Sequence, residues 1–134
     1  MTLYYYVTNE FGTGHRFMKQ SVFTGSAQRS IPSFDLTSDD QPILFAYKRM
    51  EDIWDESCGE PDLPQRHNFY TIIWVMSGSG SHLVDFTRYE ISPGRLFFLS
   101  PGQVHQVITP ERPIGLVLMF TADFVCRYNI GEDF

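Results

Sequence analysis

The sequence predicts an all-β fold, an antiparallel sandwich or barrel, followed by the start of a C-terminal helix. From residue 43 onward, short runs of β-branched and aromatic residues recur, and turns such as Pro93-Gly94 and Pro101-Gly102 separate them. No stretch between the runs is long enough for the crossover helices that a parallel sheet requires. The 134 residues, 43% of them hydrophobic, suffice for one domain with its own core.

The first element in chain order is an N-terminal arm or loop-rich segment, residues 1–42. It holds scattered glycines and prolines and the polar run from Thr37 to Gln41. One marginal strand is predicted over residues 3–7. A poorly ordered terminus explains this composition as well as a functional arm does.

Residues 43–58 give two conflicting signals. This stretch lacks Gly and Pro, and its apolar side chains, from Ile43 to Trp54, fall at helical spacing. The spacing of the apolar side chains alone predicts a helix over the whole stretch. The alternative is a strand over 43–50 followed by a short acidic turn over 51–56.

The rest of the predicted domain, which spans residues 43–121, consists of strands. We expect them over residues 69–76, 81–86, 95–99, 103–108 and 114–120. In the tail, Thr121 can cap a helix that has Asp123 in its first turn, followed by Phe124, Val125 and Tyr128. Residues 122–134 are therefore expected to begin a linker helix that the chain cuts short.

Composition restricts the partners and the compartment. Ten basic against sixteen acidic residues give a formal charge of −6, which provides no general attraction for nucleic acid or anionic lipid. The N-terminus lacks the basic start and apolar stretch of a signal peptide, and no apolar run could span a bilayer. We therefore expect a cytoplasmic protein in which Cys58 and Cys126 are free thiols.

The glycine-rich run from Ser77 to Ser81 resembles a phosphate-binding loop or a nucleophile elbow only superficially. It lacks the third glycine, the lysine and the following helix that a phosphate loop needs. The glycines beside Ser79 are not at the flanking positions of an elbow. A hairpin turn is the better interpretation.

Two longer segments carry a more specific pattern. The first segment matches the spacing of the first motif of the cupin superfamily at Gly59, Gln65, His67, Thr71 and Gly78. The second segment matches the spacing of the second cupin motif at Gly94, Ser100, Gly102, His105 and Thr109. The chain thus resembles cupins, small barrels built as a double-stranded β-helix. The amino-acid sequence from Arg66 to Phe124 is similar to the N-terminal sensor domain of AraC-type transcriptional regulators. The most specific part of this similarity is Pro101-Gly102-Gln103-Val104-His105.

This resemblance implies a regulatory domain that binds a small-molecule effector, a sugar being one candidate, and needs no cofactor. In that family a downstream helix pair dimerises and a C-terminal pair of helix-turn-helix units binds DNA, so this chain would make no DNA contact itself. We expect a monomer or weak dimer for this chain and a homodimer for the full-length regulator. The alternatives are a small metal-dependent cupin enzyme, a sugar isomerase or dioxygenase, and a dimerisation module with a filled barrel.

Four residues are the predicted ligand-binding set: Gln65, His67, Thr71 and His105. At the four metal-ligand positions of cupins, this sequence retains only two imidazoles and has no carboxylate. Such a set should hold a metal weakly through His67 and His105, so we expect no metal and no catalysis. Structural roles for His67 and His105, at the barrel rim and the Pro101-Gly102 turn, remain open.

Four other side chains receive structural assignments. His15 and His82 are expected at the surface or in the arm. Trp74 is expected to pack between the sheets, and Trp54 to cover the barrel mouth or fill the acidic turn.

Overall fold

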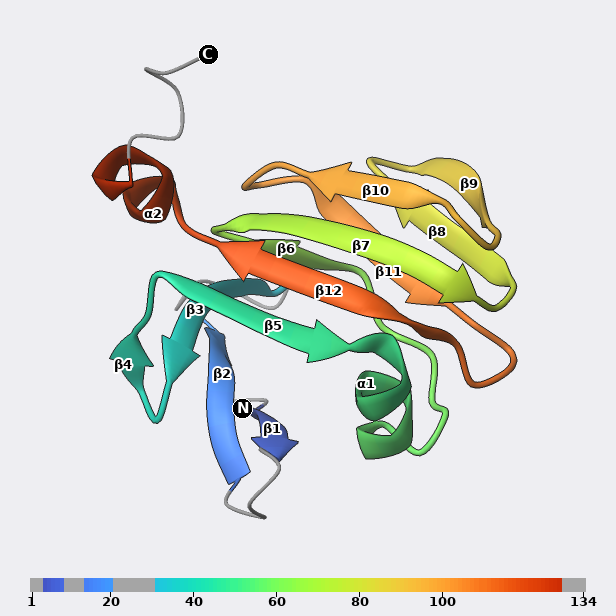
Figure 1. Ribbon diagram of the computed structural model, residues 1–134, viewed down its shortest axis with the longest axis horizontal. Helices are drawn as coiled ribbons and strands as arrows, with labels where there is room; N and C mark the ends of the chain where they lie inside the picture. Colours follow the sequence, from blue (N-terminus) through green and yellow to red (C-terminus); the bar gives the residue numbers. More distant parts are fainter. Residues whose placement is uncertain (1–3, 9–13, 21–30, 129–134) are drawn as a thin grey trace.

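The computed structural model describes residues 4–8 and 14–20 as backbone and residues 31–128 in full, and these form two facing, mostly antiparallel sheets (Figure 1). The larger sheet has the spatial order β1 (Tyr4–Thr8), β2 (Gly14–Gln20), β3 (Ser33–Ser38), β6 (Gln65–His67), β11 (Val104–Ile108), β8 (Gly80–Val84) and β9 (Thr87–Ile91), with β4 (Gln41–Pro42) paired to β3. The smaller sheet has the order β10 (Leu96–Leu99), β7 (Tyr70–Ser77), β12 (Ile114–Phe120) and β5 (Phe45–Arg49).

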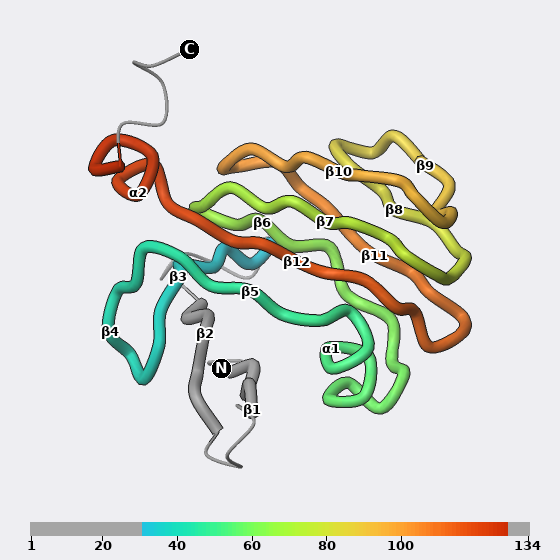
Figure 2. Tube along the Cα trace, viewed as in Figure 1, coloured from blue at the N-terminus to red at the C-terminus, as the bar shows by residue number. Residues whose placement is uncertain are grey.

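The path of the chain defines the fold as a cupin-like jelly roll. From β5 onward the chain crosses repeatedly between the sheets, with β5, β7, β10 and β12 in the smaller sheet and β6, β8, β9 and β11 in the larger (Figure 2). One parallel pair, β3 with β6, interrupts the otherwise antiparallel pairing. The predicted all-β class is therefore confirmed.

The core lies between the two sheets and follows from strand alternation. In β7, Thr71, Ile73 and Val75 are buried while Ile72 and Trp74 face outward. Phe69 and Val75 are fully buried, and Phe34 of β3 is 2% exposed. Trp74 itself is 46% exposed, so its predicted place between the sheets is wrong. Its parity puts it on the outer face of the smaller sheet.

Residues 43–58 combine parts of both predictions. Strand β5 covers Phe45–Arg49, and the helix α1 covers Met50–Glu56. A helix over the whole stretch is therefore wrong, and the predicted acidic turn is a short helix. In β5 the side chains of Ala46 and Lys48 alternate inward, so the apparent helical period in that part was coincidental.

The five predicted strands beyond residue 68 occur with their ends shifted by at most two residues, and β1 overlaps the strand predicted over 3–7. Five pairing strands were missed: β2, β3, β4, β6 and β9. β3 belongs to the stretch predicted as an arm, yet its Phe34 and Leu36 are buried in the core. The division of the chain at residues 42 and 121 remains a prediction.

The predicted C-terminal helix is confirmed as α2 (Ala122–Arg127). The Thr121 hydroxyl accepts the backbone N–H of Phe124 at 3.2 Å, as an N-cap does. The Phe124 ring stacks on Phe45 with centroids 5.4 Å apart and fixes α2 against β5. Residues 129–134 lie outside the described residues. Within residues 4–8, 14–20 and 31–128, no helix has the length and apolar character needed to cross a membrane.

Candidate functional site

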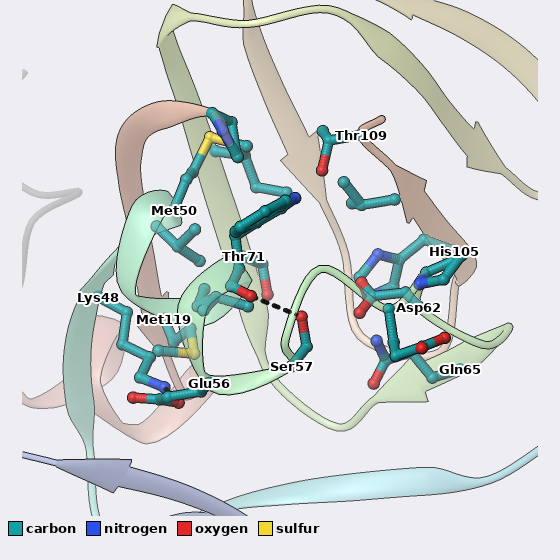
Figure 3. Close-up of a pocket in the computed structure, with 18 of the residues that line it drawn as sticks. Lys48, Met50, Glu56, Ser57, Asp62, Gln65, Thr71, His105, Thr109 and Met119 are labelled. Carbon is teal, nitrogen blue, oxygen red and sulfur yellow. Dashed lines mark hydrogen bonds and ion pairs between the residues drawn. The ribbon is translucent and has the colours of Figure 1, made fainter. Parts of the chain in front are cut away.

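A cavity of about 410 Å³ lies between the two sheets and extends beneath α1 (Figure 3). Its walls are mostly apolar: Met50, Ile53, Trp54, Ile73, Val107, Val117 and Met119. Polar residues also line it: Lys48, Glu56, Ser57, Glu60, Asp62, Gln65, His67, Thr71, His105 and Thr109. A more open hollow at Ser81 and Arg88 lies on the β8–β9 surface. An apolar cavity with a few converging polar groups is the usual form of a small-molecule site, so we place the site between the sheets.

The structure brings the four predicted site residues together on this cavity. β6 directs Gln65 and His67 inward and Arg66 outward, and β11 pairs with β6 so that His105 lies opposite Gln65. Thr71 comes from β7 in the other sheet. His67 Nδ1 lies 3.4 Å from Thr71 Oγ1, and His67 Nε2 lies 3.3 Å from Gln65 Oε1 and 3.4 Å from His105 Nε2.

His82 extends this set into a chain of three imidazoles. Its Nε2 lies 3.3 Å from His105 Nδ1, and its ring meets Phe97 edge-on at 4.7 Å. His82 is 1% exposed, so the predicted surface position is wrong. Ser81 and His82 are both buried, and this break in the alternation of β8 explains why the sequence pattern missed it. The side chain of His15 lies outside the described residues.

Burial keeps all three imidazoles neutral. It lowers the pKa of His67 to about 4 and the pKa values of His82 and His105 to about 3. The neighbouring His105 lowers the pKa of His82 further, and His67 does the same to His105. At neutral pH each ring therefore offers one N–H donor and one lone-pair acceptor.

Neutral rings in a row must order their protons together. If His82 Nε2–H donates to His105 and His105 Nε2–H donates to His67, then His67 Nδ1–H donates to Thr71. His82 Nδ1, buried without a partner among the described residues, then carries only a lone pair. The reverse order would leave the buried Nδ1–H of His82 unpaired but would let His67 Nε2–H donate to Gln65 Oε1, 3.3 Å away, so the two orders satisfy different contacts. A ligand group that bonds His67 therefore influences proton positions as far as His82.

At the opposite side of the cavity, Lys48 and Glu56 form an ion pair (Figure 3). Lys48 is 9% exposed, and burial lowers the pKa of its ammonium despite the nearby Glu56 carboxylate. Because the two charges compensate each other, neither is free to pair with a charge on a ligand. Sequence reasoning missed Lys48; the only available signal was its inward parity in β5, beside Ala46.

Asp62 is a second cavity residue that sequence reasoning missed. Burial raises the pKa of its carboxyl to about 6, while a backbone hydrogen bond from Val107 acts in the opposite direction. Its backbone carbonyl accepts a hydrogen bond from Gln106 Nε2 at 2.8 Å, which ties the loop after α1 to β11. Asp62 belongs to no motif and reaches the cavity only through this loop.

Trp54 of α1 forms part of the cavity wall. Its Nε1–H is buried and has no partner among the described residues, so an acceptor on a ligand would satisfy it. A Cβ added at Gly59 would lie 2.8 Å from the Trp54 ring, and the positive φ of +73° at Gly59 also favours glycine. Both features hold the loop after α1 close against the indole.

The donor set does not fit a resident metal ion of the kind found in many cupins. The position that would carry a carboxylate is Thr71, whose hydroxyl bonds His67, and Gln65 offers only a neutral amide. No group of three or more His, Cys, Asp or Glu side chains within residues 31–128 is arranged to hold a metal. We therefore derive no chemistry through a metal.

Comparison with known families agrees with the geometry of this cavity. Residues 63–118 match the family described as AraC-like ligand binding domain. This segment of the chain is similar to an AraC-like ligand-binding domain. The matched segment includes all four predicted site residues, and the resemblance inferred from the sequence is confirmed. The comparison with curated proteins found no match.

Solved structures similar to this AraC-like domain include a cupin 2 conserved barrel domain protein from Salinispora arenicola, 26% identical over 52% of this chain and 62% of its own, with a TM-score of 0.43. An RmlC-like cupin from Shewanella frigidimarina is 24% identical over 48% and 60%, with a TM-score of 0.41. A conserved protein of unknown function from Streptococcus pyogenes is 14% identical over 46% and 54%, with a TM-score of 0.43. The chain thus spans roughly 54–62% of the length of these proteins.

Proposed function

We propose that this domain is the sensor of an AraC-type transcription regulator, and that it binds a small organic effector in the cavity between its sheets without chemical conversion. The observation that carries this proposal is the cavity itself, about 410 Å³ with largely apolar walls and a few converging polar groups. A cytoplasmic location, and DNA binding and dimerisation by a full-length regulator, belong to the same proposal.

The effector class follows from the charges around the cavity. The three imidazoles are neutral, and Glu56 already pairs with Lys48. An anionic ligand would therefore find no free cation at these groups, whereas the carboxyl groups of Glu60 and Asp62 on the same cavity could pair with a cation. Hydroxyl and carbonyl groups suit Gln65, His67 and His105, which can each donate or accept. We propose a neutral or cationic effector with an apolar body and one hydrogen-bonding end, and a sugar is one candidate.

The direct test is a thermal-shift screen of sugars and of neutral and cationic metabolites, since a ligand of the native state raises the melting temperature by mass action. For the best ligand, His105→Ala and Gln65→Ala should each weaken binding by about 1–3 kcal/mol, or roughly 5- to 150-fold in Kd by calorimetry. Asn68→Ala is the matched control, because the Asn68 side chain bonds Asp35 and Ser33 instead of the cavity residues. Equal losses in all three variants would contradict the site.

The alternative, a small metal-dependent cupin enzyme, is tested by elemental analysis of protein purified without chelator. The neutral donor set leads us to expect well under one equivalent of Fe, Mn, Ni or Zn. A stoichiometric ion that His67→Ala removes would overturn the sensor proposal in favour of a sugar isomerase or dioxygenase.

This chain alone should not bind duplex DNA. Its formal charge is −6, and its described helices α1 and α2 are short and lie at opposite ends of the smaller sheet (Figure 1). Fluorescence anisotropy with a labelled duplex at physiological salt should show no salt-dependent binding. A Kd tighter than about 10⁻⁶ M would contradict this assignment, since non-specific binding is usually weaker.

A further inference from the structure

The cavity between the sheets carries more acidic than basic side chains. Its charged lining residues are Lys48, Glu56, Glu60 and Asp62. Lys48 is the one basic member among the described lining residues, and it pairs with Glu56. The imidazoles on the cavity are neutral and add no positive charge. Glu60 and Asp62 therefore bring two carboxyl groups to the cavity with no cation to compensate them.

Neither of these two carboxyl groups has an ion-pair partner within residues 31–128. Arg112, at the other side of α1 in sequence, pairs with the exposed Asp55 instead. The Asp62 carboxyl accepts a backbone hydrogen bond from Val107. A carboxylate can accept about four hydrogen bonds, so Asp62 keeps acceptor sites for donors on a ligand.

The loop after α1 holds Asp62 in place before any ligand arrives. Gly59, with a φ of +73°, turns the chain back at the end of the helix, and the Glu60 N–H donates to the Ser57 carbonyl at 3.0 Å. Gln106 Nε2 then donates to the Asp62 carbonyl at 2.8 Å. A group fixed in this way binds a partner without a large cost for ordering the loop.

We propose that the effector is an organic cation whose ammonium group binds the Asp62 carboxylate, with Glu60 as a second negative charge nearby. This inference rests on the proposed sensor function and narrows its effector class. Asp62 lies on the side of the cavity that holds Gln65 and His105, across from Lys48 (Figure 3). An ammonium group beside Asp62 therefore stays away from the Lys48 ammonium.

The remaining lining fits an organic body better than a bare metal ion. Ile53, Ile73 and Val117 supply apolar walls. The buried Nε1–H of Trp54 has no partner among the described residues, so it needs an acceptor on the ligand. A metal ion would pair with Asp62 but would contact neither the walls nor the indole. An amine that also carries a hydroxyl or carbonyl group satisfies all three features.

The unpaired carboxylate should cost stability in the ligand-free protein. Burial raises the pKa of Asp62 to about 6, above the unfolded value of 3.8, so at about pH 8 the native state holds a charge that it disfavours. Asp62→Asn removes this charge and keeps an acceptor for Val107. The variant should therefore melt at a higher temperature than the wild type at about pH 8. A lower melting temperature would mean that the carboxylate serves to hold the loop, which would overturn the proposal.

The binding test pairs each amine with the alcohol of the same carbon skeleton. Cyclohexylmethylamine and cyclohexylmethanol form one such pair, and cyclohexanecarboxylate is the matching anion. Calorimetry on the wild-type chain should give the amine a Kd at least about 10-fold tighter than that of the alcohol, because hydrogen bonds between charged groups are stronger than neutral ones. The carboxylate should not bind.

Three variants locate this preference. Asp62→Asn should remove most of the difference between amine and alcohol, and Glu60→Gln should reduce it less, because Glu60 is exposed. Glu90→Gln is the matched control, since it removes one negative charge from β9, outside the cavity between the sheets. Equal effects of Asp62→Asn and Glu90→Gln would show that only the overall charge of the chain matters, and the inference would be wrong.

The outcomes distinguish this inference from the sensor proposal. If alcohols bind and amines bind no better, the cation inference is wrong and the sensor proposal stands. If no member of any series binds, both are contradicted. Calcium chloride supplies positive charge without an organic body, and a melting shift equal to that of the amine would show that the site takes a metal ion instead.

Discussion

Lowering the pH from 7 to 5 should reduce the free energy of unfolding by about 4 kcal/mol. The cause is the buried imidazole chain. The pKa values of His67, His82 and His105 are about 4, 3 and 3 in the folded protein, whereas an unfolded histidine titrates near pH 6.5. Below pH 6.5 the histidines of the unfolded state therefore bind protons, whereas those of the native state stay neutral. The free energy of unfolding falls until the pH reaches the folded pKa values.

Asp62 acts in the opposite direction. Its folded pKa, raised to about 6, lies above its unfolded value of 3.8, so the native state binds an extra proton between these pH values. At pH 5 each buried histidine lowers the free energy of unfolding by about 2 kcal/mol, and the protonation of Asp62 restores about 1 kcal/mol of the total loss. The total is comparable with the whole stability of many small domains, so we expect the domain to become marginal near pH 5.

Urea denaturation at pH 7, 6 and 5 measures this dependence. His82→Leu should reduce the slope of the free energy of unfolding against pH by about 1.4 kcal/mol per pH unit between pH 6 and pH 5, whatever its effect at pH 7. Asp62→Asn should steepen the loss, because it removes the compensating group. A wild-type stability that stays constant from pH 7 to pH 5 would show that the imidazoles are protonated in the native state, which contradicts the buried chain.

Gly80→Ala should cost about 3 kcal/mol or more in the free energy of unfolding. Gly80 begins β8 with a φ of +132°, and a Cβ there would lie 2.0 Å from the backbone oxygen of Ile108 in the neighbouring β11. A backbone oxygen cannot rotate away as a side chain can, so the two strands would have to separate.

Gly102→Ala provides the matched control. Gly102 also has a positive φ, +86°, but a Cβ at that position would meet nothing within 4 Å. Its substitution should cost only about 1 kcal/mol, from the backbone conformation alone. Chemical denaturation of the two variants separates the cost of the contact between the added Cβ and the Ile108 oxygen from the cost of the backbone conformation. Equal losses would mean that β8 and β11 can move apart at little cost.

Much of the fold could be predicted because Gly and Pro turns separate the strands. The missed strand β9 shows the limit of that signal: four of its five side chains are exposed, so the run Thr-Arg-Tyr-Glu-Ile carries no apolar pattern. Trp74 shows another limit. Trp74 alternates with the inward-facing Ile73 along β7, which puts Trp74 on the outer face of the sheet. The prediction placed Trp74 in the core because its side chain is apolar, but both faces of the smaller sheet are apolar.

The candidate site was predicted in part for a similar reason. Motif spacing located Gln65, His67, Thr71 and His105, because neighbouring strands hold these positions in a fixed register. Lys48 and Asp62 have no motif, and they reach the cavity through the packing of β5 and of the loop after α1. Contacts of that kind depend on tertiary structure, which a single sequence does not encode by spacing.

β12 joins the cavity to the end of the domain. Its Val117 and Met119 form part of the cavity wall, and the strand ends at Phe120, one residue before the Thr121 cap of α2. The strand is rigid along its length because it pairs with both β5 and β7. If a bound molecule displaced β12 at the cavity, α2 at the end of the strand would therefore change its orientation, while the paired centre of the smaller sheet stayed in place.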